Sequence, residues 1–127
     1  MTMKNVEQLR ASQCVPCEGG IPSLSPAEVS RHLGQLQGWT LVPNGTRIRK
    51  EWIVKNFQEG IEFFKRVAEV SESEGHHPDL HLVEYRLTVI EIWTHAIGGL
   101  SENDFILAAK IDEIPIVLKQ KNNHSPG

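Results

Sequence analysis

The sequence predicts an α+β domain in which helices cover one face of a four-stranded, mainly antiparallel sheet. Three observations support this fold class. Apolar residues recur at helical spacing in three segments, and β-branched and aromatic residues gather in shorter runs between them. Asn44-Gly45 is a strong hairpin signal between the first two runs. The resulting order is helix-strand-strand-helix-strand-strand-helix.

The first half of the predicted domain is a helix followed by a hairpin. Ser25 is a good N-cap and Pro26 suits the first helical position, so the helix is expected to begin here and to stop at Gly38. The segment 39–43 is a short strand candidate, and the returning strand is expected over 46–54. These two strands would form the first antiparallel pair.

The second half repeats the alternation of helix and strands. Asn56 can cap a helix that runs to about Glu72, with apolar residues at helical spacing. Two strands are expected over 80–84 and 85–95, and the second is rich in β-branched and aromatic residues. Ser101 then provides the start signal of the last helix.

The chain is expected to hold one folded domain, because 127 residues suit a single core. We expect this domain over 21–118, after a polar N-terminal extension over 1–20 and before a disordered tail over 119–127. The extension carries Cys14 and Cys17 in the segment CVPC, which cannot close a four-ligand zinc site alone. A structural or incidental role, a metal site completed elsewhere, and a redox role all stay open.

The composition is that of an ordinary globular protein, with 39% hydrophobic residues, 23% charged residues and a net charge of −3. No apolar run approaches the roughly 20 residues that span a bilayer, and the first ten residues lack the apolar centre of a secretory signal. A mildly acidic chain without a basic stripe is a poor candidate for direct nucleic-acid binding. We therefore expect a cytoplasmic protein that binds neither membranes nor nucleic acid directly.

Three histidines are the first candidates for chemistry. His76 and His77 lie in the loop after the second predicted helix, and His95 lies at the far end of the fourth predicted strand. Because side chains alternate faces along an unbulged strand, Tyr85 and His95 are expected on the same face. The opposite parity is expected to face the helices, and it comprises Thr88, Ile90 and Ile92.

Each candidate also has an ordinary structural explanation. Adjacent histidines in a loop are often solvated, and His95 can be a simple strand-end residue. Asp104 can be a helix-capping acid, while Tyr85 and Trp93 on a strand usually pack against a core or an interface. No single residue therefore identifies a site, and only their combination can.

That combination is a long pattern with fixed spacing. It reads Glu72-x3-His76-His77-Pro78-x6-Tyr85-x9-His95-x8-Asp104, and Gly38-Trp39 precedes the first hairpin. Over roughly residues 24–114 the pattern resembles the signature of the pterin-4a-carbinolamine dehydratase family. Gly75 is a mild departure, since relatives often carry an acidic or other polar residue at this position.

The resemblance implies a hydro-lyase that uses no cofactor and no metal. Its substrate would be a 4a-hydroxytetrahydropterin, which aromatic amino acid hydroxylases produce from their pterin cofactor, and its product a quinonoid dihydropterin. Histidine suits the proton transfers because its unperturbed pKa is about 6.5. The resemblance implies that His76 and His95 transfer protons, and that His77 positions the pterin or stabilises the leaving hydroxyl.

The same resemblance gives supporting roles to five other residues. Asp104 would orient a histidine and favour its protonated form, and Glu72 and Pro78 would hold the loop of the histidine pair. Trp39 would line the pocket, and Tyr85 would be a further substrate-binding or supporting residue. The family analogy also implies a homodimer or homotetramer.

Two other functions are compatible with the sequence. Three histidines and Asp104 could bind zinc with one position open, although neither an HxH nor an HExxH spacing is present. Alternatively, the chain could be a dimeric scaffold or transcriptional cofactor, with Leu87, Val89 and Trp93 in a subunit interface. Stoichiometric zinc needed for activity would favour the first, and loss of the histidines without a phenotype would favour the second.

Overall fold

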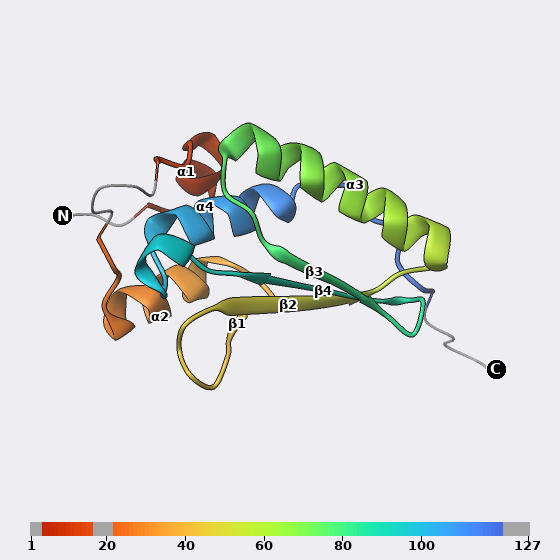
Figure 1. Ribbon diagram of the computed structural model, residues 1–127, viewed down its shortest axis with the longest axis horizontal. Helices are drawn as coiled ribbons and strands as arrows, with labels where there is room; N and C mark the ends of the chain where they lie inside the picture. The colour runs from red at the N-terminus through yellow and green to blue at the C-terminus, as the bar shows by residue number, and fades with distance from the viewer. Residues whose placement is uncertain (1–3, 17–21, 121–127) are drawn as a thin grey trace.

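A computed structural model describes residues 4–16 and 22–120, and the predicted α+β class is confirmed (Figure 1). Its elements in chain order are α1 (Val6–Ala11), α2 (Pro26–Gln35), β1 (Thr40–Leu41), β2 (Ile48–Ile53), α3 (Phe57–Glu74), β3 (Asp79–Val83), β4 (Leu87–Ile92), the short 3-10 helix η1 (His95–Ile97) and α4 (Glu102–Ile111). The four strands pair antiparallel in the order β1-β2-β4-β3. Helices α3 and α4 lie together on one face of this sheet.

The helix ends follow from local capping. At the start of α2, the Ser25 hydroxyl accepts a hydrogen bond from the Glu28 amide, and the Glu28 carboxylate accepts one from the Ser25 amide. At the start of α3, the Asn56 side chain accepts a hydrogen bond from the Glu59 amide. The predicted N-caps at Ser25 and Asn56 are therefore confirmed.

The inner strand β4 has one face toward the helices. Thr88, Ile90 and Ile92 are fully buried there, which confirms their predicted placement. Val89 points to the opposite face and is still only 3% exposed. Val89 is paired with Glu51 of β2 and His81 of β3, and the side chains of such cross-strand partners flank it on this second face.

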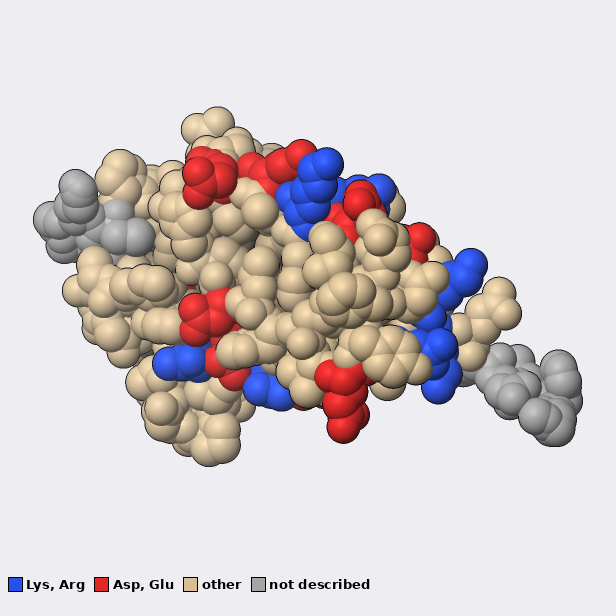
Figure 2. Space-filling model, turned by 45° about the vertical axis from the view of Figure 1, so that its right-hand side comes forward, with Lys and Arg blue, Asp and Glu red and all other residues tan. Residues whose placement is uncertain are grey.

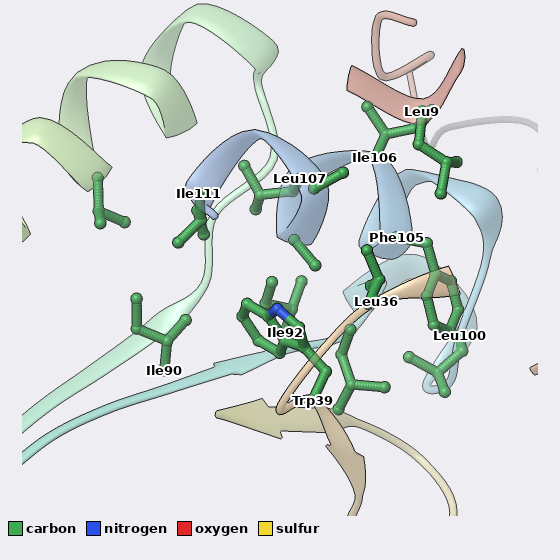
Figure 3. Packing of buried hydrophobic residues seen from close by; sticks show 14 of the residues in the cluster. Leu9, Leu36, Trp39, Ile90, Ile92, Leu100, Phe105, Ile106, Leu107 and Ile111 are labelled. Atoms are coloured by element: carbon green, nitrogen blue, oxygen red, sulfur yellow. The ribbon is translucent and has the colours of Figure 1, made fainter. Parts of the chain in front are cut away.

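Helix α4 is at the centre of the hydrophobic core, and eight of its ten residues are buried. Figure 3 shows Phe105 and Leu107 of this helix among side chains from α1, the sheet and the α2–β1 connection. Each fully buried Leu, Ile or Phe side chain contributes about 1.5–3 kcal/mol to folding. The core therefore fixes the position of α4, which carries Asp104 in its first turn.

The sequence does not predict α1, which lies inside the expected N-terminal extension. Asn5 caps this six-residue helix, and Leu9 is fully buried against the core that contains α4. A helix of this length is too short to show a clear apolar period, and packing rather than propensity stabilises it. The domain boundary expected at residue 21 therefore separates residues that share one core.

The predicted fourth strand over 85–95 is too long at both ends. Glu84 and Tyr85 have φ values of +50° and +52° and form the turn that joins β3 to β4. At the other end, His95 begins η1. Tyr85 and His95 thus lie at opposite ends of β4, and the expectation that they share a strand face is wrong because neither residue is part of the strand.

Charges of both signs are mixed over the face of the molecule in Figure 2, without a large region of one sign. Within residues 4–16 and 22–120, no helix has the length and apolar character needed to cross a membrane. Cys17 and residues 121–127 of the expected tail lie outside the described residues.

Candidate active site

The end of α3 determines how the histidine pair is presented. Gly75 follows the helix with φ +66°, a left-handed conformation that glycine adopts without strain, and the His76 amide donates to the Ser71 carbonyl. Pro78 favours an extended backbone at His77. Neighbouring side chains then point in opposite directions, so His76 is 5% exposed while the His77 side chain is 57% exposed.

His76 points inward to the fully buried carboxylate of Asp104. The distance from His76 Nε2 to Asp104 Oδ1 is 2.6 Å. The other oxygen, Oδ2, accepts hydrogen bonds from the Thr94 hydroxyl and the Ser101 amide, each at 2.8 Å. A buried carboxylate needs several donors to replace its lost hydration. This network therefore holds Asp104 in one orientation and, through it, the His76 ring.

His77 makes the corresponding contact at the surface. Its Nε2 lies 2.5 Å from Oε2 of Glu72, whose side chain is 75% exposed. Glu72 is in the last turn of α3, so this contact ties the loop of the histidine pair to the helix before it. The geometry is consistent with the role expected for Glu72.

His95 reaches the same region from the end of β4. It begins η1, and its ring centroid lies 4.4 Å from that of Trp93. The guanidinium of Arg47 covers the Trp93 ring at 3.9 Å from the centroid, which is a cation–π contact. His95 is exposed, and its contact with Trp93 gives its ring a defined position.

The three histidines line one cavity of about 170 Å³. The other lining residues are Gly75, Trp93 and Ala96. Asp104 and Glu72 are not in the lining, but each contacts one of the histidines that is. Pro78 directly follows the pair and precedes β3. The three histidines of the spaced sequence pattern therefore lie together at one cavity.

Trp39 and Tyr85 do not line this cavity. Trp39 is 5% exposed and packs in the hydrophobic core, where Figure 3 shows its ring beside Ile92. Its indole N–H donates to the Asp112 carboxylate just after α4, at 3.0 and 3.2 Å from the two oxygens. Tyr85 is 57% exposed in the β3–β4 turn. The expectation that Trp39 lines the pocket is therefore wrong, because its indole is used in core packing.

Sequence reasoning missed the contributions of Thr94, Trp93 and Arg47 to the site. Thr94 is fully buried and donates to Asp104, while the Trp93 ring lies beside His95 and is covered by the Arg47 guanidinium. Arg47 carries no signal in the spaced pattern, because it reaches Trp93 through the fold. The capping role of Asp104 was expected as an alternative to a functional one, yet the same carboxylate caps α4 and holds His76.

A larger cavity of about 560 Å³ lies next to η1 and shares no lining residue with the histidine cavity. Ile97 lines the larger cavity, whereas His95 and Ala96 line the smaller one. The larger cavity is bounded mainly by apolar residues of α2 and by Gly98–Leu100, and none of its lining residues is titratable. It offers no group for acid–base chemistry.

Among the described residues, one group has metal-ligand spacing, and it contains none of the predicted site residues. Asp79, His81 and Glu91 place possible ligand atoms within 4.8 Å of one another. Burial alone would raise the pKa of Glu91, but hydrogen bonds from Arg47 and Arg49 outweigh it and hold that pKa below its usual range. Two guanidinium groups thus already neutralise this carboxylate. The alternative zinc site of three histidines and Asp104 is not among the groups with metal-ligand spacing in the described part of the chain.

Cys14 is half-buried beside the ends of α3 and α4. Its thiol pKa is raised to about 12, first by burial and then by the nearby Glu74 carboxylate. The thiolate is the reactive form of cysteine, so Cys14 is an unreactive thiol at neutral pH. This argues against a redox role for Cys14 itself.

A buried imidazole–carboxylate pair beside two exposed imidazoles is an arrangement of groups that can transfer protons. Comparison with known families shows to which family the chain belongs. Residues 22–114 match the family described as Pterin 4 alpha carbinolamine dehydratase. The chain belongs to this family of hydro-lyases.

Individual relatives agree with this assignment. "Pterin-4-alpha-carbinolamine dehydratase 2, mitochondrial" of Arabidopsis thaliana is 48% identical over 118 residues, which cover 91% of this chain and 63% of that protein. A Nitrosospira multiformis protein named for the same dehydratase is 48% identical over 109 residues, which cover 86% of this chain and 94% of that protein. The crystal structure of a "transcriptional coactivator/pterin dehydratase" from Brucella melitensis has a TM-score of 0.67 at 26% identity, covering 72% of this chain and 96% of the other.

Proposed function

We propose that this chain dehydrates a 4a-hydroxytetrahydropterin to the quinonoid dihydropterin, and so returns the pterin cofactor of aromatic amino acid hydroxylases to use. The observation that carries the proposal is the His76–Asp104 pair, placed beside His77 and His95 in one cavity. The family membership supports the same reaction.

The reaction needs two proton transfers and no redox change. The C4a hydroxyl is a poor leaving group, so it takes up a proton before the C4a–O bond breaks and water departs. N5 loses its proton, and the electron pair of that N–H bond forms the N5=C4a double bond. One proton is gained and one is lost, so the substrate yields only the product and water.

The two proposed proton-transfer groups differ in their surroundings. Asp104 orients His76 and stabilises the imidazolium that forms when His76 takes up a proton. His95 is exposed and its ring lies tilted against that of Trp93, so it can exchange protons with solvent between turnovers. His77, held by Glu72, is proposed to position the pterin or to stabilise the leaving hydroxyl.

The size of the cavity suggests how much of the substrate it holds. Its volume of about 170 Å³ is below the roughly 300–1,000 Å³ of pockets that enclose drug-sized ligands. We expect the reacting edge of the pterin, with N5 and C4a, to enter the cavity and the remainder to extend outward. Trp93 offers an aromatic surface at this entrance.

A homodimer or homotetramer is proposed to form through α3 and β3. In this sheet order β3 is an edge strand, and large apolar side chains are exposed beside it. They are Phe57, Ile61 and Leu80. Open strand edges and exposed apolar patches are typical of interfaces. The interface expected from Leu87, Val89 and Trp93 fits less well, because β4 is an inner strand. Sedimentation velocity measures the assembly directly.

The proposed function is tested by dehydration of freshly made carbinolamine with the wild type and with His76→Ala, His77→Ala and His95→Ala. A positioned acid or base contributes about 10²–10⁴-fold, so kcat is expected to fall by about that factor in His76→Ala and His95→Ala. His81→Ala is the matched control, since His81 is exposed on β3 and outside the cavity. Wild-type protein without activity, or folded histidine variants with unchanged turnover, would overturn the proposal.

A further inference from the structure

Cys14 and Val15 lie against the two helix ends that carry the His76–Asp104 pair. Helix α3 ends immediately before Gly75-His76, and Asp104 is the third residue of α4. The segment that follows α1 contacts both of these ends. One short stretch of chain therefore spans the supports of both members of the pair.

On the α4 side, the contact is made by Asn103, which directly precedes Asp104 and is 1% exposed. Its side-chain Nδ2 donates to the Val15 carbonyl at 2.8 Å, and its Oδ1 accepts from the Val15 amide at 3.0 Å. A side-chain amide that pairs with both groups of one backbone residue fixes their orientation as well as their distance. The Cys14 thiol adds a contact to the Asn103 carbonyl at 3.5 Å.

On the α3 side, the contact is made by Glu74, two residues before His76. Its Oε1 accepts from the Cys14 amide at 2.8 Å, and its Oε2 lies 3.1 Å from Nζ of Lys110 in α4. Burial alone would raise the pKa of Glu74, but the Cys14 amide and the Lys110 ammonium outweigh it and hold the pKa below its usual range. A carboxylate at a helix C-terminus opposes the helix dipole, so these partners account for its position.

The same segment is anchored to α4 independently of these contacts. Leu9 is buried in the core, and the surface pairs Lys4–Glu102 and Arg10–Glu113 lie at 2.9 and 3.2 Å. The match to the family covers only residues 22–114. Cys14 and Val15 therefore lie outside the residues that the family model matches.

We propose that Cys14 and Val15, together with Asn103 and Glu74, form an N-terminal clamp that sets the position of His76 relative to Asp104. The expected effect of the clamp on catalysis rests on the proposed function. Its expected effect on the position of His76 relative to Asp104 does not. Asn103 and Glu74 are positioning residues, because they act on the pair through the backbone and touch no substrate atom.

The clamp is expected to affect turnover more than substrate binding. A misplacement of about 1 Å at a catalytic group can cost about 10²-fold in rate, and loss of one arm of the clamp allows a fraction of that shift. We expect kcat to fall roughly tenfold with KM nearly unchanged. A residue that only stabilised the fold would leave kcat of the folded protein as it was.

The test compares Asn103→Ala and Glu74→Ala with two matched variants. Glu74→Gln loses the charge opposite Lys110 but retains an oxygen that accepts from the Cys14 amide, so it is expected to keep most of the turnover. Arg10→Ala removes an exposed ion pair of the same segment and is expected to behave as the wild type. Steady-state kinetics of the full chain gives kcat and KM for each variant.

A second measurement does not depend on the reaction. The proton between His76 Nε2 and Asp104 is sheltered, and its exchange with solvent can be followed by NMR. Exchange is expected to be severalfold faster in Asn103→Ala and Glu74→Ala, because the buried pair opens to solvent more often when one arm of the clamp is lost. Glu74→Gln and Arg10→Ala should leave it unchanged.

These readouts separate the two proposals. If the wild type lacks dehydratase activity, the proposed function fails, while faster proton exchange in the two alanine variants still supports the clamp. If both alanine variants keep wild-type kcat and exchange, even with a lower unfolding temperature, the clamp is overturned. If Asn103→Ala does not fold, the Glu74→Ala and Glu74→Gln pair decides alone: equal kcat and equal exchange in these two variants would overturn the clamp.

Discussion

His76 and His77 are neighbours in the sequence, and each contacts one carboxylate at short distance, yet the two pairs are physically different. The side chains of His76 and Asp104 are 5% and 0% exposed, whereas those of His77 and Glu72 are 57% and 75% exposed. Gly75 and the extended backbone that follows it cause this division. Similar contacts therefore have dissimilar energetic consequences.

A buried pair has no water to replace a lost partner. Breaking it leaves a polar or charged group unsatisfied, which costs several kcal/mol, whereas an exposed pair is replaced by water at little cost. The buried pair is thus suited to hold one geometry, and the exposed pair is suited to move with a ligand. The variants below test this difference on stability, from the largest expected effect to the smallest.

The largest effect is expected for Asp104→Ala. It removes the acceptor for His76, Thr94 and the Ser101 amide at once. The free energy of unfolding should fall by about 3–5 kcal/mol, as for other buried pairs that lose one partner. Urea denaturation measures it. A loss below about 1 kcal/mol is typical of an exposed pair and would contradict the claim that burial makes this network costly to break.

The next largest loss in the free energy of unfolding is expected for Thr94→Val. The substitution keeps the shape but removes the hydroxyl that donates to Asp104 and contacts the Ser101 hydroxyl at 2.7 Å. Buried groups left without a partner cost about 1–3 kcal/mol. Thr40→Val is the control, because Thr40 is exposed on β1 and its change should stay within about 0.5 kcal/mol. Equal losses in the two variants would contradict the comparison.

A smaller loss of stability, which depends on pH, is expected for Glu74→Gln. Its pKa is held below the ordinary value of 4.5 in the folded protein, so its contribution is present above that pH and is lost as the pH falls through the folded pKa. Wild type should therefore be more stable than Glu74→Gln at pH 7, and the gap should close in acid. Thermal unfolding from pH 7 to pH 3 follows it. A gap that stays constant with pH would show that the Glu74 charge plays no part.

The smallest effect is expected for Glu72→Gln, two residues earlier on the same helix. Because the pair with His77 is exposed, its loss should cost less than about 1 kcal/mol, and added salt should shrink that difference further. Urea denaturation at low and high ionic strength provides the measurement. A salt-independent loss as large as that of Asp104→Ala would remove the distinction between the two pairs.

Local features of the chain were predictable from the sequence. The N-caps at Ser25 and Asn56, the alternation along β4 and the stop after α3 each depend on a few neighbouring residues. The three histidines of the spaced pattern, His76, His77 and His95, line one cavity, and their roles in catalysis stay a prediction. In these cases the information lies in the segment itself or in the recognised pattern.

The errors come from contacts between distant segments. Trp39 pairs with Asp112, 73 residues away, and nothing near Trp39 predicts that its indole N–H is satisfied there. Helix α1 is too short to be seen without the core it packs on. The shortened β4 depends on two residues with positive φ, and neither Glu84 nor Tyr85 is a residue type that signals such a turn.

The position of Leu9 has a consequence for folding during synthesis. α1 packs against α4, so α1 must wait until α4 has been synthesised before Leu9 can be buried. At about 5–20 residues per second, the intervening chain takes several seconds to synthesise. During that time Leu9 lacks its core partners, and the contacts that join α1 to α4 can form only after residues 102–111 have left the ribosome.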